Sequence, residues 1–131
     1  MVDSNVLLDL MTEDARWLAW SAAAIEQAAD RYRLVINPII YAEVSVRYSQ
    51  IEDLEAALPT TMFERKTLPY EAAFLAGKVF LAYRRRGGRK LSPLPDFFIG
   101  AHAAVAGYKL MTRDAVRYRT YFPKLSLIAP G

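Results

Sequence analysis

The chain contains no cysteine and only one histidine, His102, among its 131 residues. The lack of cysteine excludes disulfide bonds, thiol catalysis, iron–sulfur clusters and cysteine-held zinc. One histidine also leaves little with which to build a Ser-His-Asp triad or a histidine-rich zinc site. A bound metal ion would therefore have to be held by oxygen ligands, which favours Mg²⁺ or Mn²⁺.

Long hydrophobic runs are also missing. The longest uncharged runs, residues 17–25 and 97–108, fall well short of the ~20 residues of a membrane helix. The first residues lack the basic start of a secretory signal, so we expect a cytoplasmic protein without a membrane segment. Hydrophobic residues make up 53% and charged residues 24%, which is typical of a packed globular protein. The length predicts one domain over residues 1–131.

Positive charge is scarce in the first 72 residues, which hold 6 basic and 12 acidic side chains. Residues 84–131 reverse this balance, with 10 basic side chains against only Asp96 and Asp114. A basic second half suits a polyanionic partner, and the alternative is a solvated positive face.

Short apolar runs alternate with longer helical stretches, which predicts βαβ units around a parallel sheet. Asn37 and Pro38 form a helix start, with asparagine as the N-cap and proline at the first helical position. The predicted fold is an α/β protein, a three-layer α/β/α sandwich with a central parallel sheet. Strands are expected at residues 1–2, 34–36, 63–68, 109–112 and 125–128. Helices are expected at residues 12–31, 38–48, 51–58, 69–83, 95–107 and 114–121.

Three aspartates occupy one kind of position in this pattern. Asp3 and Asp114 each follow a predicted strand, and Asp96 begins a predicted helix. Ligands of open parallel sheets bind beyond the carboxyl ends of the strands, where such side chains can meet. Aspartate is also a preferred N-cap, so helix capping remains the alternative for Asp96 and Asp114.

Glu43 also has two interpretations. It lies four residues before Arg47, the favourable order for an exposed ion pair on a helix. It also shares a helix face with Ile39 and Ile40, which draws it toward the interior. If Glu43 and the three aspartates converge, their repulsion requires a cation. A divalent ion meets that need and can activate water beside a phosphate, so an acidic pocket with a basic surround favours a phosphodiesterase.

Four segments, in this order and over essentially the whole chain, together resemble the PIN-domain ribonucleases, and among them the VapC-type toxins of toxin–antitoxin pairs. They are DSNVLL at residues 3–8, NPIIYAE at 37–43, DFFIGAHA at 96–103 and LMTRD at 110–114. Only Met1 and Val2 precede Asp3, fewer than is usual in that family, so pairing at the centre of the sheet would have to anchor the first aspartate.

The resemblance implies a metal-dependent endoribonuclease. A water activated by Mg²⁺ or Mn²⁺ would attack the RNA phosphodiester in line and leave a 5′-phosphate and a 3′-hydroxyl. The resemblance further implies a homodimer and a cognate antitoxin protein as partners. The carboxylates that it assigns to the metal and to catalysis are Asp3, Glu43, Asp96 and Asp114.

Asn5 and Thr112 are implied to orient these carboxylates through hydrogen bonds. Both residue types also perform turn chemistry, which is the alternative. His102 shares helix faces with Ile99 and Val105, and we expect it to be a packed histidine. We expect Tyr118 in a core or a dimer contact, although tyrosines among basic residues can stack bases.

The densest basic run follows a predicted helix and precedes Asp96. We predict that it contacts RNA phosphates without reading sequence, and the alternative is a solvated helix end. The resemblance implies that an antitoxin docks on the same face. The predicted nucleic-acid-binding residues are Arg84, Arg85, Arg86, Arg89, Lys90 and Arg113.

Other functions remain open. A PIN fold that binds RNA or protein without catalysis would typically lack one of the four carboxylates. A phosphatase with an aspartate nucleophile resembles an Asp-x-Asp start, where this chain has Asn5. A receiver-like signalling domain would need a lysine after a late strand, where this chain has the turn from Thr112 to Asp114. Which RNA is cut does not follow from the sequence.

Overall fold

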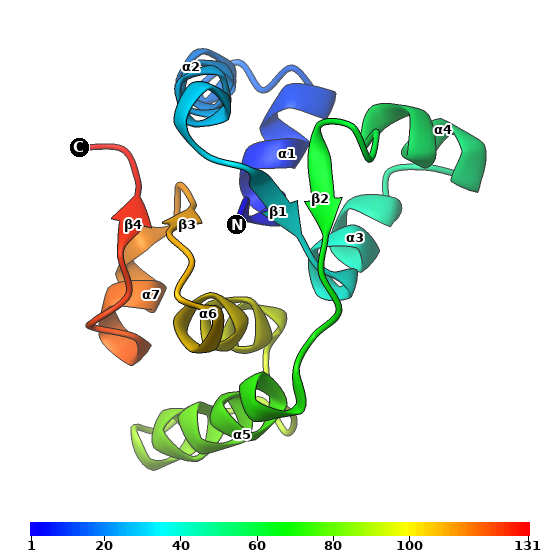
Figure 1. Ribbon diagram of the computed structural model, residues 1–131. Helices are drawn as coiled ribbons and strands as arrows, with labels where there is room; N and C mark the ends of the chain where they lie inside the picture. The colour runs from blue at the N-terminus through cyan, green and yellow to red at the C-terminus, as the bar shows by residue number, and fades with distance from the viewer.

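The computed structural model describes residues 1–131 as seven helices and four strands. Strand β1 (Leu34–Ile36) pairs in parallel with β2 (Phe63–Arg65), and β3 (Leu110–Met111) pairs in parallel with β4 (Leu127–Ile128). The N-terminus joins these two pairs. Val2 forms a parallel bridge with Met111, and its backbone N–H donates to the carbonyl of Val35 at 2.9 Å. Asp3, whose backbone N–H donates to the carbonyl of Met111 at 2.9 Å, therefore lies at the end of this central segment, and Figure 1 marks the N-terminus between the two strand pairs.

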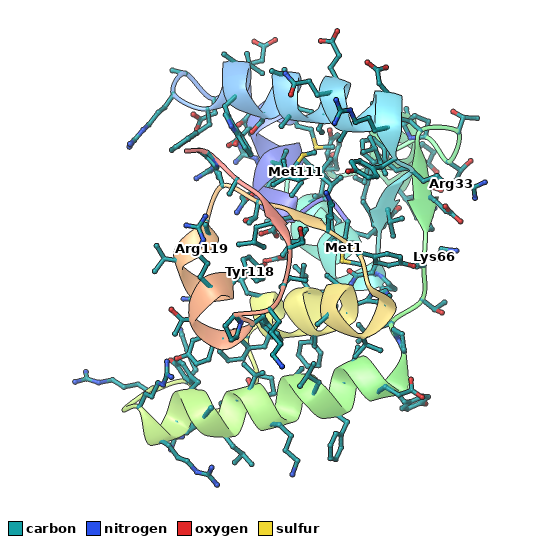
Figure 2. The ribbon with its side chains drawn as sticks, turned by 60° about the vertical axis from the view of Figure 1, so that its left-hand side comes forward. Met1, Arg33, Lys66, Met111, Tyr118 and Arg119 are labelled. Atoms are coloured by element: carbon teal, nitrogen blue, oxygen red, sulfur yellow. The ribbon has the colours of Figure 1, made fainter.

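The helices lie on both sides of the strands, which confirms the predicted α/β/α arrangement. In Figure 1, helices α1 (Ser4–Met11) and α2 (Leu18–Arg31) lie above the strands, and α6 (Pro95–Ala106) lies below them. Helix α5 (Tyr70–Arg85) packs on α6 from outside, as Figure 2 also shows. All three residues of β1 are buried, as a strand covered on both faces requires.

The segment after Asp3 differs from the prediction. Residues 4–11 form α1, which the sequence analysis missed, and α2 begins at Leu18 rather than at residue 12. Glu13 adopts a left-handed conformation, with φ of 50°, which interrupts the helical path. The Asp14 carboxylate then accepts from the backbone N–H groups of residues 16 and 17 and so forms the turn that precedes α2.

The remaining elements agree with the predicted order, with ends that differ by a few residues. Helix α3 (Pro38–Ser45) has the predicted N-cap, because the Asn37 Oδ1 accepts from the backbone N–H of Ile40 at 2.9 Å. Two short helices complete the fold, α4 (Ile51–Ala57) and α7 (Ala115–Tyr121). No helix has both the length and the apolar character needed to cross a membrane.

Candidate metal centre

Three carboxylates from distant parts of the chain converge at the carboxyl edge of the strands. Asp3 follows Val2, which pairs with β3. Glu43 comes from α3 and Asp96 from the first turn of α6. Each offers a carboxylate oxygen, and these oxygens all lie within 4.8 Å of one another. We call these residues the acidic cluster. Asp114 is exposed at the start of α7 and does not belong to this group, although its charge contributes to raising the pKa of Asp96.

Asp3 is buried and held by hydrogen bonds from four residues. Its Oδ2 accepts from the Thr112 hydroxyl at 2.8 Å, the Tyr118 hydroxyl at 3.0 Å and the Asn5 amide at 3.3 Å. Its Oδ1 accepts from the backbone N–H of Ser4 at 2.8 Å. The carboxylate therefore has one fixed orientation, and Oδ1 retains more free acceptor capacity than Oδ2.

Asn5 and Thr112 link this carboxylate to the loop that carries Asp114. The Asn5 amide donates to the Thr112 hydroxyl oxygen at 3.2 Å, and its Oδ1 accepts from the backbone N–H of Arg113 at 3.3 Å. The Thr112 hydroxyl oxygen also accepts from the backbone N–H of Asp114 at 3.1 Å. The structure thus places both predicted orienting residues against Asp3.

Glu43 is held by a residue that the sequence analysis did not single out. The Ser4 hydroxyl donates to its Oε1 at 2.8 Å. Glu43 forms no ion pair with Arg47, so the exposed-pair alternative is wrong. Ser4 directly follows Asp3 in the first motif, and this position could have indicated that Ser4 contacts the acidic cluster.

Asp96 pairs with a cation from another helix. Its Oδ2 lies 3.0 Å from Nη1 of Arg117 on α7. The N-cap of α6 is Leu94, so Asp96 is not the cap of its helix. Asp114 does occupy the N-cap position of α7, but its side chain forms no capping hydrogen bond. Arg117 and Tyr118 lie one helical turn after Asp114, a spacing that could have pointed to them.

Burial and mutual repulsion favour the protonated carboxyl groups when no cation is bound. Burial raises the pKa of Asp3 to about 6, and the Asp96 charge adds to this, while the Thr112 hydrogen bond opposes it. Burial also raises the pKa values of Glu43 and Asp96. The pKa of Tyr118 is raised by burial and by the Asp3 charge, so its hydroxyl stays protonated and donates.

The donor set of the acidic cluster fits a hard divalent cation. Mg²⁺ and Mn²⁺ prefer oxygen ligands, and a few carboxylates with water complete their coordination. The charge of such an ion favours the charged carboxylates and so opposes the burial and the repulsion that raise the three pKa values.

The family model of the PIN domain matches residues 1–123. The chain belongs to the PIN domain family. This confirms the resemblance that the four sequence motifs indicated. A sequence search of the curated proteins found no match.

Solved structures similar to this PIN domain include a chain of VapBC2 from Rickettsia felis, bound to a promoter DNA fragment. The two are 17% identical with a TM-score of 0.75, over 100% of this chain and 98% of that chain. A chain of VapBC-1 from nontypeable Haemophilus influenzae is 22% identical with a TM-score of 0.71, over 98% of this chain and 96% of that chain. A chain of a toxin–antitoxin complex from Klebsiella pneumoniae is 23% identical with a TM-score of 0.62, over 99% of this chain and 96% of that chain. Similarity at these identities shows a common fold.

The basic segment, residues 84–90, lies in this PIN domain at the end of α5 and in the loop that leads to α6. Its charged side chains are exposed. Arg84 donates to the carbonyl of Lys90 at 3.0 Å, and Arg86 stacks over Tyr121 of α7 with its guanidinium carbon 5.4 Å from the ring centroid. The rings of Tyr83 near the end of α5 and Phe97 near the start of α6 pack edge to face, 5.5 Å apart, so the segment lies near the Asp96 end of α6.

Arg113 has a different position from the other predicted nucleic-acid-binding residues. Its Nε donates to both oxygens of Asp9, at 2.8 and 3.1 Å, and Asp9 is only 2% exposed. The guanidinium also lies over the ring of Trp17. Arg113 therefore links the loop before Asp114 to α1 through an ion pair with Asp9, which was not predicted from the sequence.

His102 is packed, as expected. It is 2% exposed, and its Nδ1 lies 3.0 Å from Nδ2 of Asn37. Since the Asn37 Oδ1 already caps α3, its amide group donates to His102, and the imidazole proton lies on Nε2. Burial lowers the pKa of His102, so the ring stays neutral at pH 7.

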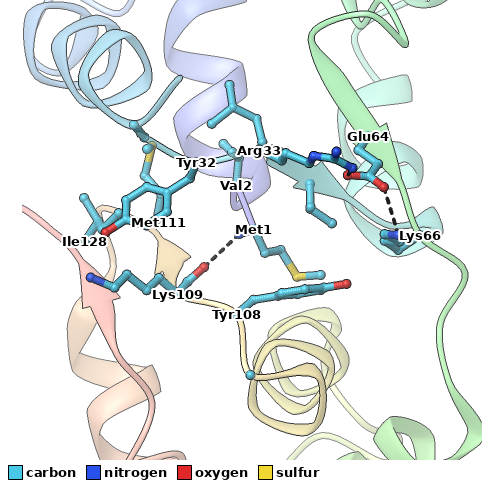
Figure 3. Close-up of a pocket in the computed structure, with 14 residues that line it drawn as sticks. Met1, Val2, Tyr32, Arg33, Glu64, Lys66, Tyr108, Lys109, Met111 and Ile128 are labelled. Atoms are coloured by element: carbon cyan, nitrogen blue, oxygen red, sulfur yellow. Dashed lines mark hydrogen bonds and ion pairs between the residues drawn. The ribbon is translucent and has the colours of Figure 1, made fainter. Parts of the chain in front are cut away.

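A cavity of about 460 Å³ lies between the two strand pairs, beside the N-terminus (Figure 3). Met1, Tyr108 and Lys109 line one part of it, and the charged Glu64 and Lys66 at its rim pair with each other at 2.9 Å. None of the acidic-cluster residues lines this cavity, so it is separate from the candidate metal centre.

Proposed function

We propose that this PIN domain is a metal-dependent endoribonuclease that acts as the toxin of a toxin–antitoxin pair. The observation that carries the proposal is the convergence of three carboxylate oxygens within 4.8 Å at the edge where parallel sheets bind ligands. Asp3, Glu43 and Asp96 would hold Mg²⁺ or Mn²⁺. Asp114, exposed beside them, would complete the acidic site from the start of α7.

The bound ion would supply a more acidic water and would stabilise the charge that develops on the phosphate. The protein's contribution is preorganisation. Thr112, Tyr118 and Asn5 fix Asp3, and Ser4 fixes Glu43, so the carboxylates need little rearrangement to receive a cation. The protonated Tyr118 keeps one Asp3 oxygen occupied and leaves the other for the ion.

RNA would approach along the basic segment. Its five cations are exposed at the end of α5, beside the start of α6 that carries Asp96. Phosphate contacts of this kind position a nucleic acid without reading its sequence. We assign this role to Arg84, Arg85, Arg86, Arg89 and Lys90. Arg113 would contribute its charge from the neighbouring loop, while its Nε stays on Asp9.

The proposal includes two protein partners. The solved relatives described as VapBC and as a toxin–antitoxin complex support a cognate antitoxin. A homodimer is supported by α5, whose Tyr70, Phe74 and Leu81 lie at helical spacing and are exposed. Light scattering of the purified protein tests the homodimer.

The test is cleavage of a structured RNA by the purified protein with Mg²⁺ or Mn²⁺. We expect cleavage that EDTA abolishes and that Asp96→Asn lowers by at least about 100-fold, since a metal ligand is lost. Asp30→Asn, the same change at an exposed site on α2, should cleave as the unchanged protein does. Cleavage that survives Asp96→Asn would contradict the proposed site. Metal binding without cleavage of any RNA would favour a binding module that has no catalysis.

A further inference from the structure

Arg117 provides the only cation paired with a member of the acidic cluster. Its Nη1 lies 3.0 Å from Asp96 Oδ2, and neither Asp3 nor Glu43 forms an ion pair. The Arg117 side chain is 41% exposed and that of Asp96 is 24% exposed. One oxygen of Asp96 is thus paired with an arginine, in a carboxylate that also belongs to the acidic cluster.

We propose that Arg117 is an internal counter-ion that competes with the divalent cation for Asp96 and so sets the metal affinity of the site. The inference rests on the proposed metal centre. In the metal-free protein, the guanidinium neutralises part of the charge of the acidic cluster. When the ion binds, Arg117 leaves Asp96, which makes it a positioning residue rather than a catalytic one.

Two features make this exchange feasible. A partly exposed ion pair between a long side chain and a carboxylate contributes little net free energy, because water competes for both groups. A divalent ion would be held by the three carboxylates of the acidic cluster and would carry twice the charge of arginine. Arg117 also has room to move, since its side chain reaches Asp96 from a partly exposed position on α7.

The experiment measures Mn²⁺ binding at pH 7 by titration calorimetry, without RNA. Arg117→Met removes the competing charge but keeps an unbranched side chain, so we expect binding about two- to fivefold tighter. Arg119→Met removes the same charge from the outer side of α7, where Figure 2 shows Arg119 away from Tyr118. It should change the affinity less than about twofold. Arg117→Lys should return the affinity close to that of the unchanged protein.

A second measurement follows the melting temperature. The metal-free Arg117→Met protein should melt at a lower temperature, because the carboxylates lose their counter-ion. Saturating Mn²⁺ should then raise its melting temperature by more than it raises that of the unchanged protein. A merely structural role for Arg117 would lower the melting temperature without tightening Mn²⁺ binding.

Each remaining outcome separates this inference from the proposed function. If Asp96→Asn weakens Mn²⁺ binding while Arg117→Met leaves it unchanged or weaker, the inference is overturned and the metal centre stands. Equal tightening by Arg119→Met would also overturn it, because net charge alone would then explain the effect. If Asp96→Asn binds Mn²⁺ as tightly as the unchanged protein, or none of the proteins binds it, the proposed metal centre itself fails.

Discussion

At the scale of single residues, Asp3 is the most constrained carboxylate of the site. It is 2% exposed, and its two oxygens accept hydrogen bonds from Thr112, Tyr118, Asn5 and Ser4. A buried carboxylate costs free energy unless donors or cations compensate it. The donors compensate only in part, since burial still raises the pKa of Asp3 to about 6. The side chain is thus oriented before a cation binds, but its raised pKa makes the charged form less favourable than in water.

Tyr118→Phe tests this orientation. The change removes a hydrogen bond to Asp3 Oδ2 that favours the charged form, and it leaves the buried ring in place. We expect about 10-fold weaker Mn²⁺ binding, a typical loss for a group that orients a metal ligand, and about 1 kcal/mol lower stability. Titration calorimetry and urea unfolding measure the two effects. Tyr121→Phe on the same helix forms no such bond and is the control; equal losses in both variants would contradict the assigned role.

At the scale of elements, α6 brings Asp96 to the strands through close packing. Its Gly100 is buried, and a Cβ atom there would lie 2.5 Å from the ring of Phe122. Phe122 is itself 7% exposed and follows α7, the helix that carries Arg117 and Tyr118. A small residue at position 100 therefore sets how closely α6 and the end of α7 approach, and with them the groups around Asp96.

Gly100→Ala and Gly77→Ala form a matched pair within helices. A methyl group at position 100 must displace the Phe122 ring, so we expect about 1–3 kcal/mol lower stability. At position 77 on α5, no atom lies within 4 Å of an added Cβ. Gly77→Ala should therefore raise stability by about 0.5–1 kcal/mol through helix propensity. Urea unfolding followed by circular dichroism compares them, and similar changes in both variants would contradict the packing argument.

At the scale of the whole molecule, the acidic cluster makes stability depend on pH and on metal. The pKa of Asp3 is raised from 3.8 to about 6, so the folded state binds its proton more tightly than the unfolded chain does. This contribution to stability is fully present below about pH 4 and is lost as pH rises through about 6. A divalent cation would reverse the trend, because it stabilises the folded state with charged carboxylates.

Urea unfolding in EDTA at pH 4.5, 5.5, 6.5 and 7.5 tests this dependence. The neutral His102 works in the opposite direction, because burial lowers its pKa. The difference between the unchanged protein and Asp3→Asn isolates the contribution of the Asp3 carboxyl group to this pH dependence. We expect the unchanged protein to lose on the order of 2 kcal/mol relative to Asp3→Asn from pH 4.5 to 7.5. A difference that stays constant with pH would contradict the raised pKa.

The sequence by itself determined much of this protein. The absence of cysteine and the single histidine restricted any metal site to oxygen ligands. Asn37 and Pro38 fixed the start of α3, because the N-cap is a local interaction. The four motifs pointed to the PIN family, and three of their carboxylates converge. These features depend on composition, on short spacings and on the rule that parallel strands carry ligands at their carboxyl ends.

Other features were decided only by the tertiary structure. Tyr118 reaches Asp3 across 115 residues, and Arg117 reaches Asp96 across 21. The sequence favoured RNA contact for Arg113, whereas the fold places its Nε on the buried Asp9. Helical spacing shows which residues share a face, but it does not show what that face meets. The meeting depends on how α1, α6 and α7 pack around the strands, and long-range packing of this kind leaves no local pattern in the sequence.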